Sequence, residues 1–436
     1  MRSIRPGSPG PGSGVEAEPG LGGPYRGGLL NQSFPELIEQ ACGSNYYMPG
    51  HRQNVKPPIL GRMLTIRGGT LAGMACAARL AKLGHEVRLD LAGGPLGGRW
   101  AAERGALPPV VTLPATWRDL FKKTGRPLEA ELSRAGLALV EAPPAVHLFD
   151  DGAELALPTE RGRQFAVLSA RYGEGVAGQW RDLLDSLDDA WLAARRFGVE
   201  RPDAPSTAED RRAMLLDRTL ADVADRAGHP HLARIVLDLA PVAGTGSRRA
   251  PGLLATRLVV ERTFGRWQVV DDAGRAQPGG RLIELLEGRL ATRRVSVVDG
   301  VGAEPTVDCL PRRPRWGRAA PAPAVGHAES GSGAEGAAET VDHTGPAPVL
   351  TWRIPGRELT WDYRRARRDI EWGVEPGSAR AVLRRVPVVA GTPAASSCSP
   401  AGPEPWAELA GAALAVYEVH ERLTGEDARP TNRARR

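Results

Sequence analysis

The chain has 436 residues, of which 42% are hydrophobic and 25% are charged, which is ordinary for a globular protein and long enough for two domains. Its net charge of +6 comes from 57 basic and 51 acidic residues scattered among one another, so no basic stripe marks a nucleic-acid surface. No apolar run reaches the roughly 18 residues of a membrane span, no signal peptide is visible, and the four cysteines lack metal-ligand spacing. Composition therefore predicts a cytoplasmic protein with neither a nucleic-acid partner nor a metal site.

The first segment, residues 1–62, is predicted to be a disordered or dispensable leader. It opens with a run rich in Gly and Pro and shows no pattern that would pair with a core. Met63 stands directly before the first predicted strand and is an alternative translation start. We expect a chain that begins at Met63 to keep its solubility and melting temperature.

A strand–turn–helix–strand unit follows the leader. Residues 63–67 form a short apolar strand, and residues 68–73 fill a G-x-G-x-x-G frame with Thr70 at its second glycine. Apolar residues then recur at helical spacing up to Gly84, which is placed to end the helix. Residues 87–91 alternate between apolar and polar, as in a strand with one buried face. This order is typical of the opening βαβ unit of a dinucleotide-binding domain.

Two positions of this unit depart from the dinucleotide-binding pattern. Thr70 puts a β-branched side chain where bare backbone approaches the pyrophosphate, and Leu91 stands where an acid binds the ribose. Asp90 is the neighbouring acid, but an offset of one residue turns it to the opposite face of the strand. Loss of a charged hydrogen bond to ribose costs about 1.5–3 kcal/mol. The sequence therefore predicts the fold more firmly than the ligand.

A second glycine turn, Leu96-Gly97-Gly98-Arg99-Trp100, follows the second strand. Together with the glycine frame, it resembles the N-terminus of FAD-dependent oxidoreductases of the bacterial phytoene desaturase and flavin amine oxidase group. In that group, the Gly-Gly backbone approaches the flavin side of FAD and the Arg lies near the phosphates or the flavin. The resemblance implies FAD as cofactor, bound by these candidate residues: Gly68, Gly69, Thr70, Gly73, Asp90, Gly97, Gly98, Arg99 and Gly391.

Later segments carry weaker resemblances to the same group. They are residues 108–128, residues 261–267 with the Gly-Gly-Arg at 279–281, and residues 388–414, where a strand ends at Gly391 before a helix near Pro405. The resemblance implies an α/β protein with a Rossmann-like FAD-binding domain that is discontinuous in sequence, plus a mixed α+β substrate domain. The implied segments of the FAD-binding domain are 63–135, 261–310 and 386–436. Those of the substrate domain are 136–260 and 349–385. Residues 311–348, rich in Pro, Ala, Gly, Ser and Glu, are predicted to be a flexible linker or insertion.

Periodicity predicts further elements in these segments. Paired strands are expected at 138–140, 146–149 and 153–157; helices at 164–172, 176–197, 207–227, 281–290 and 406–423; and a hairpin at 349–354 and 358–362. Strands near 295–298 and 386–390 are expected to join 64–67 and 87–91 in one parallel sheet. The apolar stripe from Trp180 to Trp191 is predicted to be part of the core. The alternative is that it lines a substrate tunnel.

The sequence shows no catalytic constellation, so the catalytic residues are unknown. His229-Pro-His231 is predicted to cap a helix end rather than to bind a metal. In flavin enzymes the absence of a catalytic motif is expected, because the cofactor carries out the chemistry. The resemblance implies hydride transfer between flavin and a small hydrophobic molecule, with a peripheral membrane contact if that molecule is a lipid. The alternative is a degenerate, non-catalytic relative that serves as partner or scaffold. Oligomeric state is left open.

Overall fold

The computed structural model describes residues 63–196, 205–302, 304–311, 319–331, 336–374, 378–380, 396–397 and 403–429. These residues belong to one compact unit, Tyr46–Thr431. The leader expected at residues 1–62, the strand expected at 386–390 and the candidate Gly391 lie outside the described residues.

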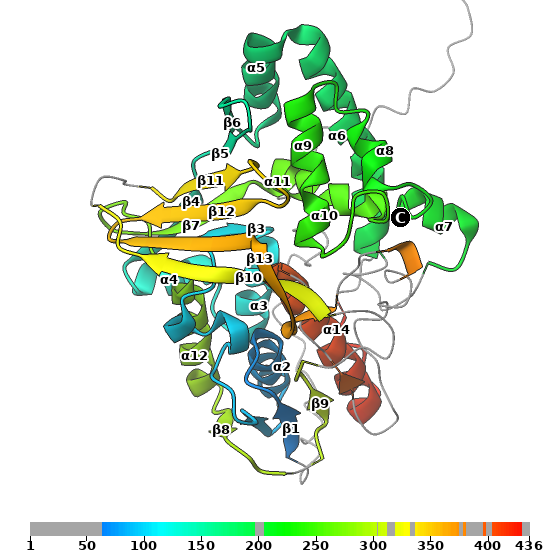
Figure 1. Ribbon diagram of the computed structural model, residues 1–436. Coiled ribbons are helices and arrows are strands. Elements are labelled where there is room, and N and C mark those ends of the chain that lie inside the picture. Colours follow the sequence, from blue (N-terminus) through cyan, green and yellow to red (C-terminus); the bar gives the residue numbers. More distant parts are fainter. Residues whose placement is uncertain are drawn as a thin grey trace, which may run out of the picture. The chain divides into compact units, whose positions relative to one another are not determined.

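The first sheet is parallel and contains the predicted βαβ unit (Figure 1). Strand β1 (Leu64–Arg67) pairs in parallel with β2 (Val87–Asp90), and helix α2 (Leu71–Lys82) connects them. Strand β8 (Ser296–Val298) continues the sheet beside β2, as predicted. On the other side of β1 lie β9 (Val307–Asp308) and β14 (Ser396–Ser397), which the sequence analysis did not anticipate.

Helix α2 is buried along most of its length. Every residue from Leu71 to Leu80 is buried, which explains why this stretch is mostly small or apolar, and its one charged residue, Arg79, pairs with Asp119. It packs against α3 (Ala115–Thr124), α12 (Gly280–Thr292) and α14 (Pro405–Thr424). The C-terminal helix expected from the sequence, α14, therefore packs directly on α2.

A second, six-stranded sheet and a third, three-stranded sheet make up the mixed part of the fold (Figure 1). In the six-stranded sheet the order is β10 (Ala319–Ala328), β13 (Arg357–Val374), β12 (Val349–Ile354), β11 (Ala338–Asp342), β5 (Ala145–Leu148) and β6 (Glu154–Leu157). The three-stranded sheet consists of β3 (Val110–Thr112), β7 (Arg266–Asp271) and β4 (Leu137–Glu141). The predicted β5–β6 and β12–β13 pairings are confirmed, whereas β4 pairs with β7 instead.

The flexible linker expected at residues 311–348 is wrong for much of its length. Strands β10 and β11 both lie within it. Its Pro and Ala content resembles a linker, but β10 is an edge strand, where a missing backbone N–H costs no ladder hydrogen bond. Pro321 and Pro323 are therefore compatible with a strand there.

Seven helices among the described residues form a separate layer at the top of Figure 1. They are α5 (Arg161–Tyr172), α6 (Glu174–Arg195), α7 (Ala208–Ala213), α8 (Leu220–Ala224), α9 (Pro230–Leu237), α10 (Leu239–Val242) and α11 (Thr256–Phe264). The stripe from Trp180 to Trp191 on α6 is buried core. A short helix α4 (Leu128–Arg134) lies elsewhere, beside β4.

The single helix expected at 207–227 is wrong, because the chain breaks there into α7 and α8. Leu215 takes a positive φ of 49° between them. Thr219 then starts α8 with a capping box, in which its hydroxyl accepts the N–H of Asp222 and the Asp222 carboxylate accepts the N–H of Thr219. Among the described residues, the helices are all too short or too polar to cross a membrane.

Candidate functional site

The first glycine turn joins β1 to α2 and has the tight geometry that its first and third glycines predict. Gly68 has a φ of +106°, which disfavours any side chain. A Cβ at Gly73 would collide with the carbonyl oxygen of Gly68. Helix α2 therefore starts directly against the end of β1, as close helix–strand packing in this motif requires.

Thr70, the departure at the second glycine, is the N-cap of α2. Its hydroxyl oxygen accepts the N–H of Gly73 at 3.1 Å and donates to the carbonyl of Cys309 at 3.2 Å. One of the free donors at the helix N-terminus is therefore bound within the chain. A Thr placed before an apolar helical run is an N-cap signal, so this role of Thr70 could have been predicted from the sequence.

The second glycine turn lies against the first. Gly97 donates its N–H to the carbonyl of Gly69 at 2.7 Å. Gly97 and Gly98 both take positive φ angles, 87° and 59°. A Cβ on Gly69 would lie 2.8 Å from both the Leu91 side chain and the carbonyl oxygen of Pro95. Three candidate glycines, Gly69, Gly97 and Gly98, therefore converge, and they line a cavity of about 220 Å³, the glycine-turn cavity.

Asp90 and Leu91 take the opposite positions expected from their one-residue offset. Leu91 lines the glycine-turn cavity, and Asp90 does not. The Asp90 carboxylate is buried and accepts the N–H groups of Ala92, Gly300 and Val301 at 2.9–3.2 Å. Its oxygens thus hold the turn that follows β8, and ribose binding by Asp90 stays a prediction.

Arg99 is joined to the C-terminal helix. Its Nε donates to Glu408 Oε1 at 3.1 Å, a second guanidinium nitrogen donates to the same oxygen, and both side chains are buried. Trp100 Nε1–H also donates to Glu408 Oε1, at 2.9 Å. The second glycine turn and the first turn of α14 are therefore in direct contact. Glu408 was not anticipated, although its place in the first turn of a predicted helix is a usual one for an acid.

Four tryptophans fill the space between the second glycine turn and the six-stranded sheet. They are Trp100, Trp352, Trp361 and Trp372, with ring centroids 5.2–5.9 Å apart between contacting pairs. The Arg99 guanidinium lies over two of these rings, 4.4 Å from Trp100 and 4.9 Å from Trp372. This packing stabilises Arg99 next to α14.

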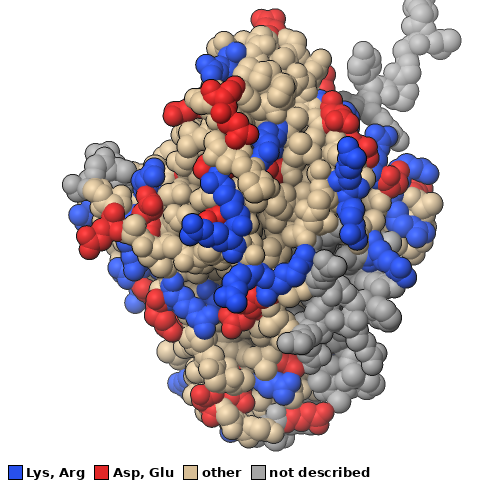
Figure 2. All heavy atoms as spheres, in the orientation of Figure 1, with Lys and Arg blue, Asp and Glu red and all other residues tan. Residues whose placement is uncertain are grey.

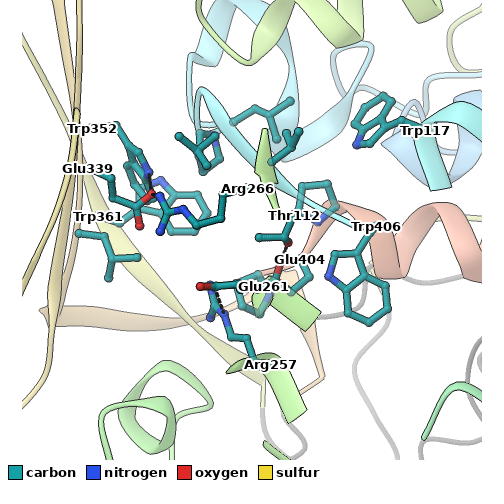
Figure 3. Close-up of a pocket in the computed structure, with 17 residues that line it drawn as sticks. Thr112, Trp117, Arg257, Glu261, Arg266, Glu339, Trp352, Trp361, Glu404 and Trp406 are labelled. Carbon is teal, nitrogen blue, oxygen red and sulfur yellow. Dashed lines mark hydrogen bonds and ion pairs between the residues drawn. The ribbon is translucent and has the colours of Figure 1, made fainter. Parts of the chain in front are cut away.

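A second cavity, the charged pocket, lies between β3, β7, the six-stranded sheet and the start of α14 (Figure 3). Its volume is about 50 Å³, enough for only a few waters. Three glutamates and two arginines line it together with tryptophans. Arg257 lies 3.0 Å from Glu404, and Arg266 pairs with Glu339, which also accepts Trp352 Nε1–H at 2.7 Å. Figure 3 draws these side chains around the pocket.

The carboxylates of the charged pocket outnumber its cations. Burial raises the pKa of Glu261 above its ordinary value, more than the neighbouring arginines lower it. Burial alone would lower the pKa of Arg257, but Glu404 and Glu261 raise it overall, so this arginine stays charged. Such an arrangement, with aromatic walls, suits a cationic ligand group.

The histidine motif is a helix cap, as predicted. His229 is the N-cap of α9, and its Nδ1 accepts the N–H of His231 at 3.2 Å. In the part of the chain that the structure describes, no three His, Cys, Asp or Glu side chains come together as metal ligands.

No protein-family model matches this chain, and no curated protein matches its sequence. Solved structures do match its fold. Cyclohexylamine oxidase from Brevibacterium oxydans superposes with a TM-score of 0.54 at 12% identity, over 83% of this chain and 99% of that one. Putrescine oxidase bound to putrescine superposes with a TM-score of 0.51 at 13% identity, over 84% and 100%. The chain has the fold of these amine oxidases, which confirms the expected α/β class with a parallel-sheet domain and a mixed domain.

Proposed function

We propose that the protein is an FAD-dependent oxidoreductase. The observation that carries this proposal is the convergence of two glycine turns on one cavity at the carboxyl end of β1, in a fold shared with two amine oxidases. Ligands of open α/β sheets bind at that edge. The N-terminus of α2, Gly68, Gly69, Gly97 and Gly98 would hold the dinucleotide, and bound FAD would supply the hydride-accepting group.

The residues present fit the dinucleotide in part. The backbone of Gly68 and Gly73 has the required geometry. The side chains of Thr70 and Leu91 take up space in the glycine-turn cavity, where the dinucleotide would approach the backbone. If flavin lies between Gly98 and the start of α14, as the family resemblance implies, the contact of Arg99 with Glu408 must open to admit it.

For the substrate, we propose a hydrophobic molecule that carries a positively charged amine. The charged pocket supports this proposal, because its three glutamates outnumber its two arginines and its volume of about 50 Å³ would admit the ammonium group alone. The two oxidases with this fold are named for amines. A substrate of the phytoene desaturase type would be uncharged and would gain no ion pair in this pocket.

The second candidate is a non-catalytic relative of the fold. The closed contact between Arg99, Trp100 and Glu408 favours it, because all three side chains are buried against one another where the flavin would meet the helix. A measurement of FAD binding separates the two candidates.

The test is the flavin content of the purified, desalted protein, measured by its near-UV and blue absorption, with FAD titrated into the colourless fraction. We expect FAD to bind. The double variant Thr70→Gly/Leu91→Glu should tighten binding about tenfold or more, because it bares the turn and restores an acceptor for ribose.

The matched control is Val297→Glu, which adds the same charge on β8 at an exposed position outside the glycine-turn cavity. No FAD binding by either the wild type or the double variant would reject the enzyme in favour of the non-catalytic relative. Equal tightening by the control would mean that charge alone, not position 91, matters.

A further inference from the structure

A groove of about 470 Å³ lies beside the edge strand β10, outside the charged pocket. This volume is within the range of small-molecule sites. Four arginines line it, against two carboxylates: Arg99, Arg104, Arg365 and Arg367, with Asp369 and Glu371. Figure 2 shows basic side chains gathered in a band across this face, over β10 and β13.

The strand pairing explains why the arginines are presented together. Between Ala322 and Ala324 of β10, the paired residue on β13 jumps from Arg367 to Asp362. The intervening residues of β13 bulge out of the ladder, as bulges beside binding sites commonly do. Arg365 lies in this bulge with its side chain 82% exposed, so the bulge turns a basic side chain toward the groove.

Arg365, in the bulge, and Arg367, beside it, are available to a ligand. Arg365 has only a distant partner, Asp362 at 3.5 Å, and its own side chain is highly exposed, so water screens the ion pair. Arg367 is exposed, and within the described ranges no carboxylate or hydrogen-bond acceptor engages its guanidinium. Arg104 pairs with Glu371 at 3.0 Å, and Arg99 pairs with Glu408.

Most of the remaining wall of the groove is apolar. It consists of Ala106, Trp372 and the β10 residues Ala322, Pro323, Ala324 and Val325, and His327 is its one further polar side chain. Val325 is 38% exposed and presents apolar surface beside the arginines. The groove thus places guanidinium groups, which match the planar geometry of oxyanions, next to a strip suited to hydrocarbon.

We propose that this groove, which we name the arginine groove, binds a small amphipathic anion: a phosphate or carboxylate attached to an apolar body. Arg365 and Arg367 bind the oxyanion, and the β10 strip contacts the apolar body. The groove shares Arg99, Arg104 and Glu371 with the glycine-turn cavity. The proposal does not rest on FAD binding, because neither Arg365 nor Arg367 lines that cavity.

The test is calorimetric titration of the full chain with octyl phosphate, octanoate and octanol, which share one chain and differ in charge. We expect octyl phosphate or octanoate to bind and octanol to bind at least tenfold more weakly. The tighter of the two anions identifies the oxyanion. Arg365→Gln and Arg367→Gln should each weaken binding about tenfold, since each removes a charged hydrogen bond.

The matched control is Arg357→Gln, which removes the same charge from an exposed position at the start of β13, outside the groove. Equal weakening by this control, equal binding of octanol, or no binding of either anion would overturn the proposal. A single-stranded oligonucleotide that binds and is weakened equally by all three variants would point instead to a general basic face. Flavin absorption is recorded in parallel and should not change in these variants, so the two proposals can fail separately.

Discussion

At the residue scale, the site is defined by polar groups that the chain itself satisfies. The Thr70 hydroxyl accepts the N–H of Gly73, the Asp90 carboxylate accepts three backbone N–H groups, and Glu408 accepts from Arg99. From the sequence, Asp90 and Arg99 look like ligand contacts and Thr70 looks like a departure from one. In the structure each also stabilises a junction between segments, so substitutions there change stability as well as binding.

Gly73→Ala should destabilise the protein by at least about 2 kcal/mol. The new Cβ would collide with the Gly68 carbonyl oxygen, a backbone atom that cannot move without shifting β1. The measurement is urea unfolding. Gly288→Ala is the control, because it lies inside α12 with open space around its Cβ and should stabilise by about 0.4–1 kcal/mol. Similar effects of the two variants would contradict the packing argument.

Glu408→Ala should lower the free energy of unfolding by about 3–5 kcal/mol, the usual cost of removing one partner of a buried ion pair. It leaves the buried Arg99 charge and the Trp100 N–H without their carboxylate. Glu418→Ala is the comparison on the same helix, where the carboxylate is 34% exposed and pairs with Arg422 at 3.9 Å. That surface pair is worth at most about 1 kcal/mol. Chemical denaturation of both variants decides; equal losses would show that the Arg99–Glu408 contact is not formed.

At the scale of elements, capping residues decide where helices begin. Thr207 and Thr219 each form a capping box. The two helices differ in packing, because α8 buries Leu220, Val223 and Ala224 whereas α7 buries no residue. The same local signal therefore has different consequences for the stability of the whole fold.

Thr219→Ala should lower the free energy of unfolding by about 1 kcal/mol, the typical value of a helix N-cap. Thr207→Ala should leave global stability nearly unchanged and raise hydrogen exchange only within α7, since that helix can open alone. Thermal unfolding and amide exchange of both variants test this contrast. A larger global loss for Thr207→Ala would mean that α7 contributes to the core.

At the scale of the whole molecule, a buried chain of polar side chains links the helical layer to the six-stranded sheet. Asp238, between α9 and α10, lies 2.6 Å from Nδ1 of His343, and His343 Nε2 lies 2.8 Å from Nδ1 of His147 on β5. All three side chains are buried. Burial, helped by the charges of His343 and Arg266, holds the pKa of His147 well below its ordinary value of 6.5.

This depressed pKa makes stability fall in acid. Below about pH 6.5, His147 binds a proton in the unfolded state but stays neutral in the folded state. The stabilisation is therefore complete above pH 6.5 and is lost as the pH falls below it. Burial lowers the pKa of His85 and His229 as well, and these add in the same direction. The raised pKa of buried Glu261 opposes them.

Comparison with His147→Gln isolates the contribution of His147, since the other groups are common to both proteins. Its free energy of unfolding, measured from pH 5 to pH 8, should depend less steeply on pH below 6.5 than that of the wild type. His327→Gln, at an exposed histidine, should keep the wild-type slope. If His147→Gln and the wild type have parallel pH profiles, His147 is not buried in its neutral form.

The sequence by itself determined the elements whose information is local. The βαβ unit of residues 64–91, the β12–β13 hairpin and α14 were all predictable, because glycine turns, apolar periodicity and capping residues act over a few neighbouring positions. The His229 cap was predictable for the same reason.

Only the tertiary structure decided what depends on distant partners. Glu408 lies 309 residues from Arg99 along the chain. Two of the backbone N–H groups that donate to the Asp90 carboxylate belong to residues more than 200 positions away. The sequence of β10 resembles a linker. In the structure β10 pairs with β13 on one side only, and its other, unpaired edge tolerates proline. No local pattern encodes such pairings, because their free energy is gained only when packing brings the segments together. For that reason the fold could be predicted from the sequence, whereas the partners of its candidate site residues could not.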